Sequence, residues 1–104
     1  MTLTRNFTET IRQRATEDEA FRAALLSQAL ELLLTGDVET GRAVLRDFIN
    51  ATIGFEKLSD VSGIPAKSLM RMFGPKGNPR TDNLFSVLTH LQAQTGIQLE
   101  VRAA

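Results

Sequence analysis

Lys67 and Arg71 stand four positions apart in a short stretch that the sequence predicts to be a helix. Side chains at that spacing lie on the same helix face. Arginine can donate two hydrogen bonds to the O6 and N7 atoms of guanine, and lysine can reach guanine or a phosphate oxygen. Ser68 can bond to any base, whereas Ala66 offers only apolar contact, for example to a thymine methyl group. These residue types in this pattern are typical of a helix that reads DNA bases.

Four further polar residues flank this stretch and are placed to bind the phosphate backbone of DNA. Between residues 53 and 80 there are five basic and two acidic residues, a net charge of +3, so the rest of this uncharged chain carries −3. A basic segment on an acidic body fits an anionic partner. The solvated face of a small helical domain gives the same pattern. The flanking residues are Lys57, Lys76, Asn78 and Arg80.

The pattern of apolar residues from 53 to 73 predicts two short helices joined by a tight turn, which is the helix-turn-helix layout. The first helix is expected from about residue 55 to residue 62. Gly63 suits the left-handed backbone of the turn, and Pro65 suits the start of the second helix. The expected inward-facing residues are Phe55, Leu58 and Val61 in the first helix and Leu69, Met72 and Phe73 in the second.

Catalysis has little support in the sequence. His90 is the single histidine, and there is no cysteine to act as a nucleophile or a metal ligand. The glycine-rich loop from residue 74 to residue 80 lacks the spacing of a phosphate-binding P-loop. We therefore expect no enzyme activity, no catalytic residue, no metal site and no cofactor.

The remaining elements are also predicted to be helices, so the expected fold is all-α, with five to six helices. Asn6 with Glu9 forms a capping-box pattern, and Asp18 and Asp37 are good N-cap residues. Thr81 or Asp82 is expected to cap the last helix, and Gly96 to end it. The inner face of the helix after Asp37 is assigned to Val38, Leu45, Phe48 and Ile49. The helices are expected over about 6–15, 18–35, 37–52 and 81–96.

We expect one domain over residues 1–104. It divides into an N-terminal helical extension (1–36), a helix-turn-helix core (37–96) and a C-terminal strand (97–102). The chain has no apolar run long enough to span a bilayer, and its first residues lack the apolar stretch of a secretory signal. No membrane partner and a cytoplasmic location are therefore expected.

The C-terminal segment IQLEV alternates apolar and polar residues, which predicts a half-buried strand. Ile97, Leu99 and Val101 lie on its apolar side. No other strand is predicted, and a lone strand needs a partner, so we expect it to pair with the same strand of a second copy. A disordered or packed tail is the alternative. The leucine-rich helix over 18–35 is another surface through which a homodimer can form.

The stretch GFEKLSDVSGIPAKSLMRMFGPKGNPRTDNLFSVLTHL closely resembles the helix-turn-helix of the phage-repressor-like family, also called Xre or Cro/repressor-like. TRNFTETI, the leucine-rich helix and RDFINATIGFEKL extend the likeness over nearly the full length to the HigA-like antidote proteins of bacterial toxin–antitoxin modules. The diagnostic residues of the repressor-like match are Leu58, Gly63, Ile64, Leu69, Met72, Phe73, Gly77, Asn78, Pro79, Asn83 and Leu84.

This resemblance implies an antitoxin that binds double-stranded operator DNA, represses its own operon and neutralises a small RelE-type ribonuclease toxin. It assigns base reading to Ala66, Lys67, Ser68 and Arg71, and backbone contact to Asn78. Ala66 stands where well-known repressors often carry Gln, so no operator sequence can be transferred. A repressor without a toxin, and a protein-interaction module that does not bind DNA, are the alternatives.

Overall fold

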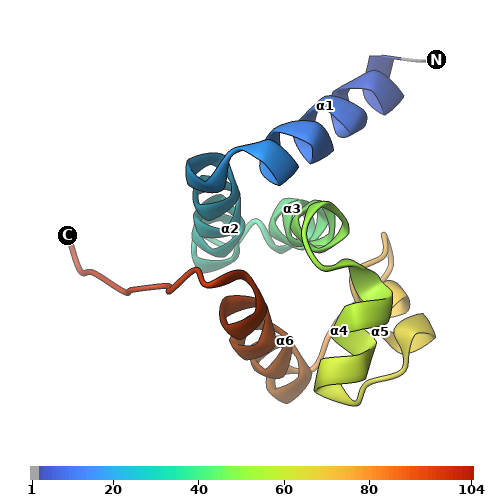
Figure 1. The fold of residues 1–104 in the computed structure, drawn as a ribbon. Coiled ribbons are helices and arrows are strands. Elements are labelled where there is room, and N and C mark those ends of the chain that lie inside the picture. The colour runs from blue at the N-terminus through green and yellow to red at the C-terminus, as the bar shows by residue number, and fades with distance from the viewer. Residues whose placement is uncertain (1–2) are drawn as a thin grey trace.

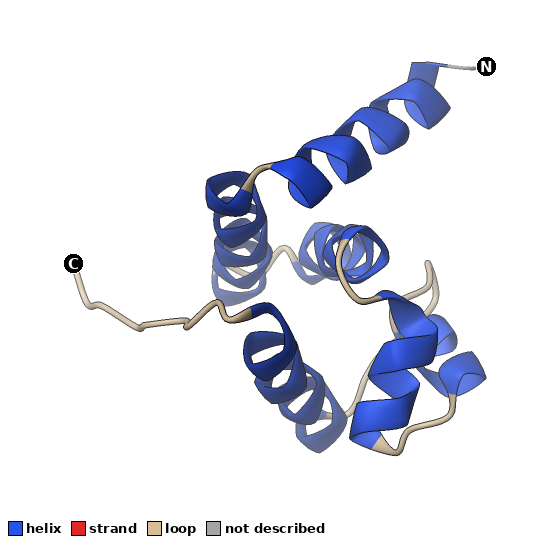
Figure 2. Ribbon diagram, in the orientation of Figure 1, coloured by secondary structure: helices blue, strands red, loops and turns tan. Residues whose placement is uncertain are grey.

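The computed structural model describes residues 3–104, and its side chains from residue 9 onward. Helices and loops account for all of this part of the chain, and no strand is present in it (Figure 2). The predicted all-α class is therefore confirmed. The helices are α1 (Leu3–Glu17), α2 (Glu19–Leu34), α3 (Val38–Ala51), α4 (Gly54–Ser62), α5 (Ala66–Met72) and α6 (Thr81–Thr95).

The helices enclose one continuous apolar core, to which each of them contributes. Helix α3 lies at the centre of the fold, where it packs against α1, α2 and α4, while α4 also contacts α5 and α6 (Figure 1). The N-terminal extension thus shares its core with the helix-turn-helix instead of forming a separate layer. The largest fully buried side chains are Phe48, Phe73, Leu26, Leu45, Ile49, Leu58, Leu69, Leu91 and Val87.

Several helix ends lie where the sequence predicts them. The Asp18 carboxylate accepts a hydrogen bond from the Phe21 N–H at 3.1 Å, and the Asp37 carboxylate accepts one from the Thr40 N–H at 3.3 Å. Each bond satisfies a backbone donor that the first turn of a helix leaves free. These two caps confirm the predicted starts of α2 and α3.

Other predicted ends are wrong. Helix α1 begins at Leu3, so Asn6 lies inside the helix and does not cap it. Arg80, whose backbone is extended, is the N-cap residue of α6, because Thr81 is already helical. The Asp82 carboxylate accepts from the neighbouring Asn83 N–H at 2.9 Å and so does not cap the helix start. Val38 is 47% exposed, because it is the first residue of α3 and lies beyond the edge of the core.

The predicted C-terminal strand is wrong, because residues 97–104 form an irregular tail with no helix or strand. Ile97 and Leu99 pack against the core of their own chain, and the Leu99 N–H donates to Gln92 Oε1 at 2.8 Å. Val101 is 96% exposed in a tail that runs away from the helices (Figure 1). The alternation correctly indicates that Ile97 and Leu99 are packed, but Val101 does not join them, and the pattern does not say what covers the packed pair. Within one chain, the partner of Ile97 and Leu99 is the helical core and not a second strand.

Helix α1 is fixed at its C-terminal end by an arginine from α2. Arg22 Nη1 donates to the carbonyl oxygens of Ala15 at 2.8 Å and Thr16 at 3.2 Å. A cation at this end also opposes the partial negative charge of the helix dipole.

No helix in the described part of the chain is both long enough and apolar enough to cross a membrane.

Asp47 on α3 is a carboxyl group whose partial burial disfavours its charge. Partial burial raises the pKa of Asp47 above its ordinary value of 3.8, and the guanidinium groups of Arg46 and Arg12 oppose that rise. Because the pKa is higher in the folded state, folding favours the neutral acid. The contribution of Asp47 to stability is therefore present below pH 3.8 and is lost as the pH rises through the folded-state pKa.

We expect Asp47→Asn to raise the melting temperature at pH 7, because the amide carries no charge to desolvate. The gain should be a few degrees at most, given that 1 kcal/mol corresponds to about 4–8 °C in a domain of this size and that the side chain is partly exposed. It should vanish near pH 3. Thermal melts at both pH values test this. The control is Asp60→Asn, at an exposed position of α4. A lower melting temperature at pH 7 would mean that pairing with Arg12 and Arg46 outweighs burial.

Candidate nucleic-acid interface

Helices α4 and α5 and the turn between them match the two short helices and tight turn that the sequence predicts. Gly63 has φ +78°, a left-handed conformation that favours glycine. Pro65, with φ −55° and ψ 140°, is the residue just before α5 and sets the direction in which that helix leaves the turn. Leu69 and Phe73 are buried in the core, so the opposite side of α5 faces solvent.

The predicted base-reading residues are exposed to different degrees. Lys67 and Arg71 are exposed, whereas Ala66 and Ser68 are partly buried. Positions i and i+4 of a helix are separated by about 6 Å along its axis, slightly more than one turn, so the two cations form a line along the helix. Met70, which the sequence reasoning had not selected, is 47% exposed next to Arg71.

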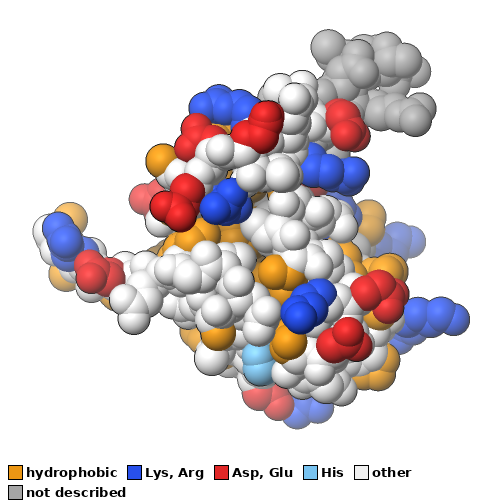
Figure 3. Space-filling view, viewed as in Figure 1, with side chains coloured by type: hydrophobic (Ala, Val, Ile, Leu, Met, Phe, Trp, Pro, Cys, Tyr) orange, Lys and Arg blue, Asp and Glu red, His pale blue; other side chains and the backbone are white. Residues whose placement is uncertain are grey.

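Lys76 joins this face through the loop after α5. Arg71 and Lys76 both line a shallow hollow at the C-terminal end of α5, together with Met70 and Gly77. Basic side chains project at the edge of the molecule where α5 lies, on the right in Figures 1 and 3. The reading face defined by Lys67, Arg71 and Lys76 therefore spans the helix and the loop that follows it.

The other three predicted contacts lie apart from this hollow. Asn78 lines a separate, mainly apolar groove between α3 and the start of α6. Arg80 pairs with Asp82 at 3.6 Å, and both side chains are largely exposed. Lys57 is exposed on α4 and is not among the residues that line the hollow. The structure thus brings together a smaller set than the eight residues that the sequence selects.

The cations of the reading face have no carboxylate partners among the side chains that the structure describes. The ion pairs found there involve Arg12, Arg14, Arg80 and Arg102. Lys67, Arg71 and Lys76 therefore keep their charges available for an external anion. Each of these cations can bind an oxygen or nitrogen acceptor without first losing an internal partner.

Two arginines of α3 bind the backbone of the loop that follows α5, and the sequence had not indicated either of them. Arg42 Nη2 donates to the Pro75 carbonyl oxygen at 3.0 Å, and Arg46 Nη1 donates to the Phe73 carbonyl oxygen at 3.4 Å. Their spacing of four residues places them on one face of α3. That spacing was the only signal in the sequence, and it did not indicate which segment the arginines contact.

Gly77 closes this loop by packing directly on the backbone of α5. A Cβ atom at this position would lie 2.2 Å from the Met72 carbonyl oxygen and 2.3 Å from the Arg71 carbonyl oxygen, so any side chain would displace backbone. The Gly77 N–H also donates to the Gly74 carbonyl oxygen at 2.9 Å. The loop is thus fixed against the end of α5 by close contact as well as by hydrogen bonds.

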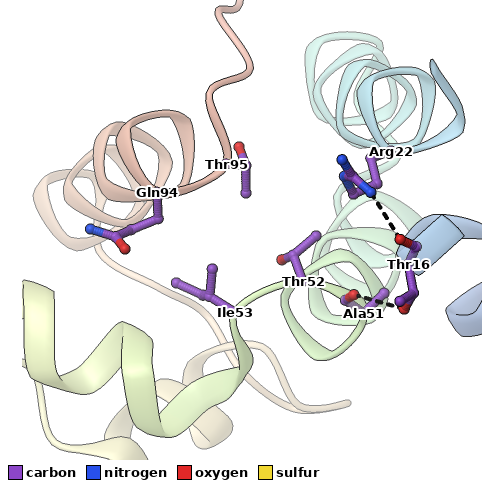
Figure 4. A pocket seen from close by; sticks show the side chains of 7 residues that line it. All are labelled: Thr16, Arg22, Ala51, Thr52, Ile53, Gln94 and Thr95. Carbon is purple, nitrogen blue, oxygen red and sulfur yellow. Dashed lines mark hydrogen bonds between the residues drawn. The ribbon is translucent and has the colours of Figure 1, made fainter. Parts of the chain in front are cut away.

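A second groove lies on another part of the molecule, where α1, α3 and α6 meet (Figure 4). Its polar groups are used within the protein: Arg22 binds carbonyl oxygens at the end of α1, and the hydroxyl groups of Thr52 and Thr95 donate to carbonyl oxygens one turn earlier. Among the described residues, no three His, Cys, Asp or Glu side chains gather in a way that could hold a metal ion. Apart from Gln94, the polar side chains that line this groove are therefore engaged within the protein.

Comparison with protein-family models, with curated proteins and with solved structures found no match to this chain. The site therefore has to be interpreted from its own residues. Its defined features are the short helix α5 after a tight turn, three cations that have no carboxylate partner among the described side chains, and a loop held by α3.

Proposed function

We propose that this protein binds double-stranded DNA through the reading face, with α5 in the major groove. One observation carries the proposal: Lys67 and Arg71 line the exposed side of a helix-turn-helix second helix, with Lys76 beside Arg71, and no carboxylate in the described structure neutralises them. A major groove about 12 Å wide admits such a helix.

Each residue has a separate role in this proposal. Arg71 reads a base, because its guanidinium can bond the O6 and N7 atoms of guanine together. Lys67 binds guanine or a phosphate at the start of the helix, and Ser68 makes a shorter-range contact because it is partly buried. Lys76 binds phosphate beside the groove and so positions the protein without reading sequence. Ala66, Asn78, Arg80 and Lys57 make weaker or more distant contacts.

The narrower proposal is a transcriptional regulator that represses its own operon as the antitoxin of a toxin–antitoxin module. The resemblance of the helix-turn-helix and its Gly77, Asn78, Pro79 segment to repressor-like proteins supports regulation, and the full-length likeness to HigA-like proteins supports the antitoxin role. A stand-alone repressor shares the DNA-binding face but has no toxin partner.

We expect Arg71→Ala to weaken binding to a specific operator by about 1–3 kcal/mol, because a bidentate base contact is lost. Lys76→Ala should weaken binding to all sequences alike and lower the salt slope by about one unit, because one phosphate contact is lost. Mobility shifts with the upstream region of the gene and with a scrambled duplex, at several salt concentrations, measure both effects.

The matched control is Arg12→Ala, which removes the same charge from α1, away from the reading face. It should bind like the wild type. If Arg71→Ala and Lys76→Ala also bound like the wild type, the reading face would be assigned wrongly. If the wild type bound no duplex, the protein-interaction module would replace the DNA-binding proposal.

We also propose that two copies associate through the C-terminal tail. Ile97 and Leu99 face their own core, which leaves the far side of the extended tail and Val101 open to a second copy. The leucine-rich α2 offers the alternative contact, since Leu34 at its end is 78% exposed. Neither side chain is part of the core, so replacing it tests association without emptying the interior.

We expect Val101→Lys to shift the protein from dimer to monomer at micromolar concentration and Leu34→Lys to leave it dimeric. Lysine suits the position of Leu34, because a cation is favourable near a helix C-terminus. Light scattering coupled to size-exclusion chromatography gives the mass. Dissociation by Leu34→Lys alone would assign the interface to α2, and a monomeric wild type would remove the dimer from the proposal.

The toxin partner is expected to be a small basic protein of the RelE type. Its nucleic-acid-binding surface would be attracted to the acidic residues of the N-terminal half by charge complementarity. We expect this chain and the product of an adjacent reading frame to co-purify after co-expression with a tag on one of them. Recovery of this chain alone, at both low and moderate salt, would favour the stand-alone repressor.

A further inference from the structure

The segment that follows α5 is held by two arginine side chains of α3. Helix α5 has seven residues, which is too short for a helix to be stable on its own. At its C-terminal end, the Phe73 N–H donates to the Leu69 carbonyl oxygen and the Gly74 N–H donates to the Arg71 carbonyl oxygen, both at 3.2 Å. Just beyond the helix, Arg46 donates to the Phe73 carbonyl oxygen at 3.4 Å and Arg42 donates to the Pro75 carbonyl oxygen at 3.0 Å.

We propose that Arg42 and Arg46 are positioning residues that fix the 73–77 loop, and through it fix the orientation of α5 and its reading face. This inference rests on the proposed function for its consequence in DNA binding, but the positioning itself is a property of the free protein. It also assigns different tasks to neighbouring cations: Arg71 and Lys76 face the partner, and Arg42 and Arg46 hold the backbone that carries them.

Three contacts join the 73–77 loop to both α3 and α5. Gly77 packs on the carbonyl groups of Arg71 and Met72, so the loop is in direct contact with the last turn of α5. Arg42 holds the middle of the loop at Pro75, and Arg46 holds its first residue. A guanidinium carries several donors in a rigid plane, so it restrains a carbonyl group better than an ammonium does.

Another arginine binds carbonyl groups near the end of a different helix. Arg22 of α2 donates to the last carbonyl groups of α1, at Ala15 and Thr16. Removing Arg22 should loosen the end of α1 and leave α5 unchanged. Arg22→Ala is therefore a control that loses the same type of hydrogen bond at a different helix.

The first experiment is amide hydrogen exchange on the free protein, followed by NMR. In Arg42→Ala and Arg46→Ala we expect the N–H groups of Phe73 and Gly77 to exchange about tenfold faster, which corresponds to the loss of one hydrogen bond to a charged group. Protection at core positions such as Leu45 should stay unchanged. Arg46→Lys, which keeps the charge, should give an intermediate rate, and it replaces Arg46→Ala if that variant does not fold.

The second experiment measures operator affinity against salt concentration. Positioning residues should lower affinity about tenfold with no change in salt slope, because the number of phosphate contacts is unchanged. A direct phosphate contact would lower the slope by about 0.9 per arginine. Arg22→Ala should bind like the wild type.

The outcomes separate this inference from the proposed function. Unchanged exchange at Phe73 and Gly77 in both alanine variants would overturn the positioning role, as would a reduced salt slope. If the wild type bound no DNA while exchange at these amides accelerated as expected, the DNA-binding proposal would fail and the positioning of α5 by α3 would stand.

Discussion

The presentation of α5 depends on the burial of Phe73. This residue is 1% exposed, and the centre of its ring lies 6.5 Å from the centre of the Phe55 ring, with the two ring planes tilted by 42°. Phe73 is also the C-cap residue of α5, and its carbonyl group receives Arg46 from α3. The side chain thus anchors the helix to the core while the backbone of the same residue is held by a second helix. A surface helix of two turns can keep a fixed orientation only with such support.

The sequence predicted best the features that depend on one or two residues. The caps at Asp18 and Asp37, the left-handed turn at Gly63 and the buried positions Leu69 and Phe73 follow from local geometry and apolar spacing. Features that depend on contacts distant in sequence were not accessible in this way. The tail shows this clearly, since its period of two fixed the side on which Ile97 and Leu99 lie but not the surface that covers them.

The candidate site also combines features that local sequence predicts with features that depend on distant contacts. The exposure of Lys67 and Arg71 could be predicted from the helical period, but the meeting of Arg71 and Lys76 around one hollow depends on how the 73–77 loop folds back. Arg42 and Arg46 could not be assigned a role from sequence, because they act on carbonyl groups about 30 positions away in the chain. Arginines at helix faces look alike in a sequence, whether they bind a partner or support the backbone.

These roles also explain how a chain with zero net charge can be proposed to bind DNA. The described ion pairs join Arg12, Arg14, Arg80 and Arg102 to carboxylates, so these charges largely cancel in pairs outside the reading face. What matters for an anionic partner is the local potential, to which unpaired cations contribute most. On this argument the reading face is basic even though the molecule is not.

The small size of the reading face connects the proposed DNA binding to the proposed dimer. One bidentate base contact discriminates against a wrong base by about 1–3 kcal/mol, and Lys67 and Arg71 offer at most two such contacts. Specific sites are distinguished from bulk DNA by about 4–10 kcal/mol. One copy would reach only the lower part of that range, whereas two copies joined rigidly would read two half-sites and double the discrimination. A helix whose orientation is fixed by α3 is required for this gain, because two reading faces can match two half-sites only if each is held at a defined angle.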